Sequence, residues 1–140
     1  EDGNTIADSQ GYYYDNFVDA TKFLGVVSSA DDIDYYDFET SMSAVGEFVL
    51  DLTDTNIDAD IWLCDSNGDE IYPGYTVGTT KKLSGIFVPP NTEYFLKVEY
   101  KSGIPKRPYE VSISFTDTAS VSMQQIRNIE DVPKSLLNNK

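Results

Sequence analysis

Short runs in which apolar and polar residues alternate dominate the middle and the end of the chain. In Tyr94–Lys101 one set of alternating positions reads Tyr, Leu, Val, Tyr, and Lys and Glu occupy the other set. Tyr109–Thr116 alternates more cleanly still. A period of two is typical of half-buried antiparallel strands. The same reasoning predicts further strands at residues 23–27, 34–39, 47–52, 59–65, 70–72 and 82–88.

The segment Ser66–Asp69 separates two of these strands and contains an Asn-Gly pair. Asn-Gly suits the left-handed backbone of a tight hairpin turn, so we predict a hairpin here. Asp65–Glu70 is also rich in acidic residues, as calcium-binding loops are. An EF-hand, however, places its glycine sixth in a twelve-residue loop, whereas Gly68 is fourth in this run. The hairpin is the better interpretation.

These patterns predict an all-β fold, an antiparallel β-sandwich of eight or nine strands. Helical turns are expected only within residues 5–20 and 120–128. We divide the chain into an N-terminal segment (1–20), a sandwich domain (21–117) and a C-terminal tail or linker (118–140). The residues expected in the core are Phe38, Phe48, Leu50, Ile61, Leu63, Leu96, Val98, Val111 and Ile113.

Composition narrows the possible functions. The chain has 140 residues, enough for one domain, and its 10 basic and 24 acidic residues give 10 − 24 = −14, with no histidine. Such a charge repels nucleic acid, and the lack of histidine excludes Ser-His and Cys-His catalysis within the chain. A single cysteine cannot form an intrachain disulfide, and no apolar run reaches the roughly 18 residues of a membrane span. Paired carboxylates can cleave glycosidic bonds without histidine, but no motif here sets two of them apart, so we predict no enzymatic activity.

The charge is distributed unevenly along the chain. Residues 1–70 hold 18 acids and one base, Lys22, which gives −17, whereas residues 71–140 hold 6 acids and 9 bases, which gives +3. Acidic residues at this density are either spread over a solvated face or neutralised by a metal ion. Both interpretations stay open at this point.

Asp31 and Asp34 are the strongest candidates for metal ligands. They lie three residues apart at the entrance to a predicted strand, so both can approach one ion from the same loop. Calcium takes six to eight oxygen ligands, and the N-terminal Glu1 and Asn4 can close over the ion. The alternative is that these aspartates cap a turn and face water.

Trp62 is the strongest candidate for contacting a ligand. If Ala59, Ile61 and Leu63 face the core, alternation places the indole on the surface with Cys64 beside it. Exposed aromatic rings form platforms for sugars or peptide chains. The alternative is that the N-terminal tyrosine-rich segment or the C-terminal tail covers the indole.

Five segments of the chain, in this order and spacing, form a recognisable pattern: Asn4–Ala7, Ser29–Phe38, Asp58–Gly68, Thr92–Val98 and Tyr109–Ile113. Together they resemble the bacterial pre-peptidase C-terminal domain, a family that includes the collagen-binding domains of secreted bacterial collagenases. The most specific is the Asp-Asp-x-Asp-Tyr-Tyr-x-Phe run at 31–38. The resemblance covers roughly residues 1–117. The chain departs from the family in the long aromatic stretch Gly11–Lys22 and at Trp62 and Cys64, where the family more often has tyrosine.

The resemblance implies a jelly-roll-like sandwich that serves as a non-catalytic accessory module of an exported hydrolase or surface protein. It implies a calcium site that matches Glu1, Asn4, Asp31 and Asp34, with Asp32 as a carbonyl donor. The expected partner is an extracellular polymer, protein or glycan, and the expected location is secreted or cell-surface. A carbohydrate-binding module and a structural spacer or protein-interaction domain are the alternatives. Because the sequence begins at Glu1 without a leader, we expect it to be part of a larger polypeptide.

Overall fold

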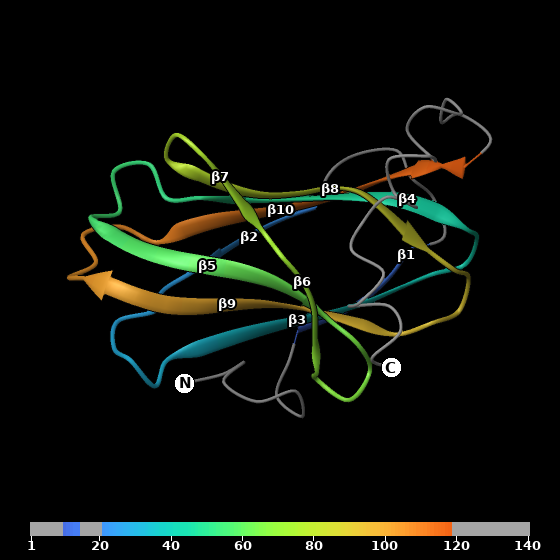
Figure 1. Cartoon of the computed structure of the whole chain (residues 1–140), viewed down its shortest axis with the longest axis horizontal. Helices are drawn as coiled ribbons and strands as arrows, with labels where there is room; N and C mark the ends of the chain where they lie inside the picture. The colour runs from blue at the N-terminus through green and yellow to red at the C-terminus, as the bar shows by residue number, and fades with distance from the viewer. Residues whose placement is uncertain (1–9, 15–20, 119–140) are drawn as a thin grey trace.

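Ten strands in two five-stranded sheets make up the computed structural model, which describes residues 10–14 and 21–118 (Figure 1). Sheet A has the order β1-β3-β9-β5-β6, and sheet B has the order β2-β10-β4-β8-β7. The strands are β1 (Gln10–Tyr14), β2 (Thr21–Gly25), β3 (Ile33–Thr40), β4 (Ala44–Asp51), β5 (Ile57–Cys64), β6 (Glu70–Pro73), β7 (Tyr75–Val77), β8 (Thr80–Val88), β9 (Tyr94–Gly103) and β10 (Tyr109–Asp117).

The predicted antiparallel sandwich is confirmed. Nine strands, β2 to β10, are joined by antiparallel pairings, and β1 adds to the edge of sheet A by pairing in parallel with β3. The helical expectation for residues 5–20 is wrong for residues 10–14, which form β1, because their main chain pairs with residues 36–40. The rest of that segment and residues 120–128 lie outside the described residues. No helix in the described part of the chain is long and apolar enough to cross a membrane.

The core lies between the two sheets and is built from the residues that alternation places inward. All nine predicted core residues are buried. Tyr109 also belongs to the core, and Tyr94 and Tyr100 pack against its edge. Aromatic rings fill one end of this core: the ring centroids of Phe38 and Phe48 lie 5.1 Å apart, and that of Phe115 lies 5.6 Å from Phe38. Removing these rings from water supplies much of the stability of the fold.

The predicted hairpin connects β5 to β6. The Asp65 carboxylate accepts the main-chain N–H groups of Asn67 (2.9 Å) and Asp69 (3.0 Å), and Gly68 adopts a φ of 84°. This carboxylate is therefore used to hold the turn, as short Asx turns do.

Candidate functional site

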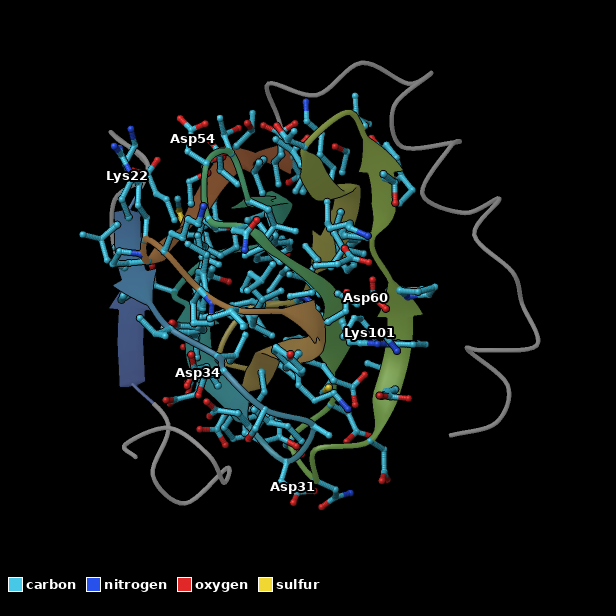
Figure 2. All side chains as sticks on the ribbon, turned by 90° about the vertical axis from the view of Figure 1, so that its left-hand side faces the viewer. Lys22, Asp31, Asp34, Asp54, Asp60 and Lys101 are labelled. Atoms are coloured by element: carbon cyan, nitrogen blue, oxygen red, sulfur yellow. The ribbon has the colours of Figure 1, made fainter. Side chains whose placement is uncertain are left out.

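The turn between β2 and β3 and the start of β3 together hold the three aspartates predicted to bind metal. The Asp32 carboxylate accepts hydrogen bonds from the N–H (2.9 Å) and hydroxyl (3.3 Å) of Ser28, and the Asp32 N–H donates to the carbonyl of Ser29 (2.9 Å). Asp32 therefore caps the turn. Asp31 is exposed at the tip of this loop, whereas Asp34 lies further along, on β3 (Figure 2).

Asp34 points into the sandwich. It alternates with Tyr36 and Phe38 on the inward face of β3 and is buried. The Tyr109 hydroxyl donates to Asp34 Oδ2 at 2.5 Å and is itself hydrogen-bonded to the hydroxyl of Tyr36. Since each phenol has one proton, Tyr36 donates to Tyr109 and Tyr109 donates to Asp34. A polar chain thus crosses the core from β3 to β10 and back.

This environment changes the acidity of Asp34. Burial raises its pKa from 3.8 to about 6; the hydrogen bond from Tyr109 opposes the rise, and the negative charge of Asp32 adds to it. Burial also raises the pKa of Tyr109, which remains a neutral donor. A buried carboxyl beside a second carboxylate is a site where a proton or a cation is favoured.

Gly25 on β2 makes room for the two phenols. A Cβ at this position would lie 2.3 Å from Tyr109 Oη and 2.8 Å from Tyr36 Oη. Real Cβ atoms do not approach so closely, so any larger residue would displace the tyrosines. The absence of a side chain at the end of β2 therefore leaves the space that the two tyrosine hydroxyls occupy.

The described residues do not form a complete metal site by themselves. No group of three or more His, Cys, Asp or Glu residues among them is placed to hold a metal ion. Asp31 and Asp32 in the turn and Asp34 at the start of β3 do offer oxygen donors of the kind that calcium prefers. Glu1 and Asn4 lie outside the described residues.

Trp62 occupies the outer face of sheet A, as predicted, but its side chain is partly buried. It lies opposite Pro73 on β6 and Lys97 on β9. Its indole Nε1 is buried and has no hydrogen-bond partner within the described ranges. Less of the indole is therefore accessible to a ligand than alternation along the strand suggests.

Cys64 is not on the surface beside Trp62, which corrects the expectation. It is fully buried, opposite Phe95, which is buried as well. Alternation places both side chains outward, but it cannot show that this part of the outer face is covered. Burial raises the pKa of the Cys64 thiol to about 12, so the thiol stays protonated and unreactive.

A series of ion pairs crosses the outer face of sheet A, a feature not predicted from the sequence. Lys81 on β8 contacts Asp58 (3.2 Å) and Asp60 (3.3 Å) on β5, and so links sheet B to sheet A. Lys101 contacts Asp60 at 3.4 Å (Figure 2). Lys97 continues the series through Glu99 (3.9 Å) and Glu70.

The uneven charge along the chain was the signal for this network. Asp58, Asp60 and Glu70 belong to the acidic first half, and the three lysines belong to the basic second half. Strand pairing brings the two halves together, because β9 lies between β3 and β5. Lysines within the fold therefore neutralise part of the acidic charge. This differs from both earlier interpretations, a solvated acidic face and a bound metal ion.

Comparison with known proteins supports the fold. No protein-family model and no curated protein sequence matches the chain. Among solved structures, the pre-peptidase C-terminal domain of collagenase from Bacillus anthracis aligns with a TM-score of 0.50 at 13% identity, over 77% of this chain and 94% of that one. PliG, a periplasmic inhibitor of g-type lysozyme from Salmonella Typhimurium, aligns with a TM-score of 0.46 at 19% identity, over 77% of this chain and 100% of that one. The chain thus has the fold of the pre-peptidase C-terminal domain, the family that its sequence resembles.

Proposed function

We propose that this chain is a non-catalytic accessory domain, secreted or at the cell surface, that helps an exported hydrolase or a surface protein to hold a polymeric substrate. The observation that carries the proposal is the fold shared with a domain of a collagenase, joined to the sequence resemblance along most of the chain. Fold alone is a weak guide to function, so each part of the proposal needs its own test.

The lack of catalysis is supported by the position of Asp34. A carboxyl with a pKa of about 6 is a natural general acid, but this one faces the core and is hydrogen-bonded to Tyr109. Its side chain is buried between the two sheets instead of being exposed to a substrate. Burial therefore explains the raised pKa of Asp34 better than a role as a catalytic acid does.

A calcium ion at the β2–β3 turn is the second part of the proposal. Asp31, Asp32 and Asp34 would supply oxygen ligands, and Glu1 and Asn4 would complete the shell. The support is the like charge of Asp32 two residues away: burial is the main cause of the raised pKa of Asp34, the charge of Asp32 adds to it, and a cation between the two carboxylates would remove that added repulsion.

Thermal unfolding in millimolar calcium and in chelator tests this part. An ion bound only by the folded state stabilises it by about 2.7 kcal/mol at a hundredfold excess over Kd. We expect a higher Tm in calcium for the wild type and no such gain for Asp31→Asn. Asp54→Asn is the matched control, because Asp54 lies in the β4–β5 loop and should keep the full calcium effect. Identical melting curves with calcium and chelator would contradict the calcium site.

The polymer would lie on the outer face of sheet A, with Trp62 as the aromatic contact. Sedimentation with collagen, cellulose, chitin and peptidoglycan identifies the polymer and separates a protein ligand from a glycan. Trp62→Ala should reduce retention, whereas Tyr75→Ala, which removes an exposed ring from sheet B, should not. A Tm for each variant shows whether it has kept its fold.

A structural spacer is the second candidate. The half-buried indole of Trp62, with Nε1 covered, favours it, because a ligand-binding ring is usually open on one side. Retention on none of the four polymers would support the spacer and would end the binding proposal.

A further inference from the structure

The loop between β9 and β10 differs from the rest of this acidic molecule. We call residues 101–108, which are the last three residues of β9 and the loop that follows them, the basic loop, since they contain Lys101, Lys106 and Arg107 and no acid. Of the seven basic residues that the structure describes, four lie within 4.0 Å of a carboxylate and three, Lys82, Lys106 and Arg107, do not. Two of these three are adjacent and exposed in the basic loop, so their charge is available to a partner.

The basic loop is held in place by its neighbours. The N–H of Lys106 donates to the carbonyl of Thr55 (2.8 Å), and the Asn56 amide donates to the carbonyl of Ile104 (3.0 Å). Gly103 has a φ of 97°, and a Cβ there would lie 2.3 Å from the carbonyl oxygen of Asn56. The loop is therefore fixed before any partner arrives, which lowers the entropy lost on binding.

An aliphatic side chain stands at the tip of the basic loop. Ile104 is 78% exposed, more than any other large apolar residue in the described part of the chain. Two prolines, Pro105 and Pro108, restrict the main chain around the cations. An isoleucine held in water beside two cations offers apolar contact and charge at one place.

The end of β9 beside this loop has an open edge. The pairing of β9 with β3 stops at Glu99, opposite Ile33, whereas its pairing with β5 continues to Gly103. Figure 1 shows the end of β9 projecting beyond β3. Residues 101–103 are exposed and pair on one side only among the described strands, so an extended chain can add to the other side.

We propose that the basic loop and the adjoining edge of β9 form a docking site for an acidic, extended polypeptide segment. Carboxylates of the partner pair with Lys106 and Arg107, an aliphatic side chain contacts Ile104, and its main chain pairs with residues 101–103. The site lies away from Trp62 and does not depend on the proposed polymer binding.

Two other anionic partners fit these residues less well. A glycan has no aliphatic side chain for Ile104 and no regular N–H groups for a strand edge. An anionic membrane extends far beyond the two cations, so the net charge of −14 would oppose it. An extended peptide is narrow enough to contact the basic loop alone, so the acidic surface around the loop does not repel it.

Fluorescence polarisation with a labelled peptide of alternating glutamate and valine tests the proposal. We expect saturable binding that weakens with added salt, and no binding of the matching lysine and valine peptide. Lys106→Glu combined with Arg107→Glu should weaken binding about tenfold or more, and Ile104→Ser should weaken it several-fold. Lys82→Glu is the matched control. Lys82 is the other described cation without a carboxylate partner, it lies on β8 outside the basic loop, and reversing its charge should leave the affinity unchanged.

Main-chain pairing is tested with a peptide that is N-methylated at alternate residues, which should lose most of its affinity. Lack of binding by the acidic peptide would overturn the proposal, and so would equal loss with Lys82→Glu. Preferential binding to heparin or to phosphatidylserine vesicles, abolished by the same double substitution, would show that the loop serves another partner and would also overturn it. Because Trp62→Ala leaves this loop intact, failure of the polymer experiment does not affect the result.

Discussion

The two ends of the core contain different chemistry, although the same two strands pass through both. Near the start of β3, Asp34 accepts a hydrogen bond from the hydroxyl of Tyr109 on β10, and the hydroxyl of Tyr36 bonds to that of Tyr109. Toward the other end of the same strands, Phe38 and Phe115 pack with their ring centroids 5.6 Å apart. The first we call the polar end and the second the phenylalanine end.

This difference separates two sources of stability. The phenylalanine end depends on apolar area and close packing, which vary little with pH. The polar end depends on the protonation of one buried carboxyl and on its donors, which vary with pH and with any bound cation. Stability measurements on variants of each end can therefore tell the two apart.

The largest expected effect is at the phenylalanine end. Phe48→Ala removes a fully buried ring that contacts both Phe38 and Phe115, and it should lower the free energy of unfolding by about 3–5 kcal/mol. The loss should be the same at pH values on either side of the Asp34 pKa. Urea denaturation measures it, with Phe87→Ala as control because Phe87 is half exposed. A loss that changes with pH would contradict the separation of the two ends.

The second prediction is the pH dependence of the polar end. The folded pKa of Asp34, about 6, lies above its ordinary value of 3.8, so the folded protein holds this proton more tightly than the unfolded chain. The stability that the proton provides is fully present below about pH 3.8 and is lost as the pH rises through about 6. The loss is at most about 3 kcal/mol.

Comparison with Asp34→Asn isolates this effect from the other acids. Urea denaturation in chelator, repeated across the pH range, should show the wild type losing stability relative to Asp34→Asn between the two pKa values. Calcium should reduce that loss if the ion binds at this turn, because a cation favours the carboxylate. Parallel pH profiles for the two proteins would contradict the assignment.

Most of the fold follows from alternation, and its failures have physical causes. The nine core residues are inward because each lies on the apolar face of a strand. β1 and β7 were not predicted, since their sequences, Gln-Gly-Tyr-Tyr-Tyr and Tyr-Thr-Val, have no alternating pattern. Edge strands need only one partner, and the main chain alone can supply it.

The candidate site was harder to predict than the fold. The motif at Asp31 to Asp34 is visible in the sequence and predicts a metal ligand at Asp34, whereas alternation with Tyr36 and Phe38 turns this side chain inward. The partner of Asp34 is Tyr109, 75 residues away, and no local pattern can identify it. Gly25 likewise has a role only because two distant phenols meet beside it.

The third prediction concerns the space at Gly25. Gly25→Ala should cost about 1–3 kcal/mol, because its Cβ would overlap the hydroxyls of Tyr109 and Tyr36. Tyr109→Phe in the same protein should recover part of that loss by removing one hydroxyl, although the Tyr109 Cζ, 2.5 Å from the new Cβ, still crowds the site. A double-mutant cycle from denaturation curves measures the coupling. Leu24→Ala, at an exposed position on the same strand, should have little effect, and a cycle without coupling would show that the hydroxyl is not the obstacle.

The smallest effect compares the removal of one hydroxyl at each end of the core. At the polar end, Tyr109→Phe takes a donor from buried Asp34 and should destabilise the fold by about 1–3 kcal/mol. Thr40, two residues beyond Phe38 on β3, has a buried hydroxyl without a hydrogen-bond partner in the described part of the chain. Thr40→Val replaces that hydroxyl with a methyl group and leaves the hydrogen bond from Asn91 to the Thr40 carbonyl unchanged, so it should stabilise the fold by about 0.5–1 kcal/mol. Opposite signs in urea denaturation would support the contrast, whereas a loss of stability in both variants would mean that the phenylalanine end also depends on a buried hydroxyl.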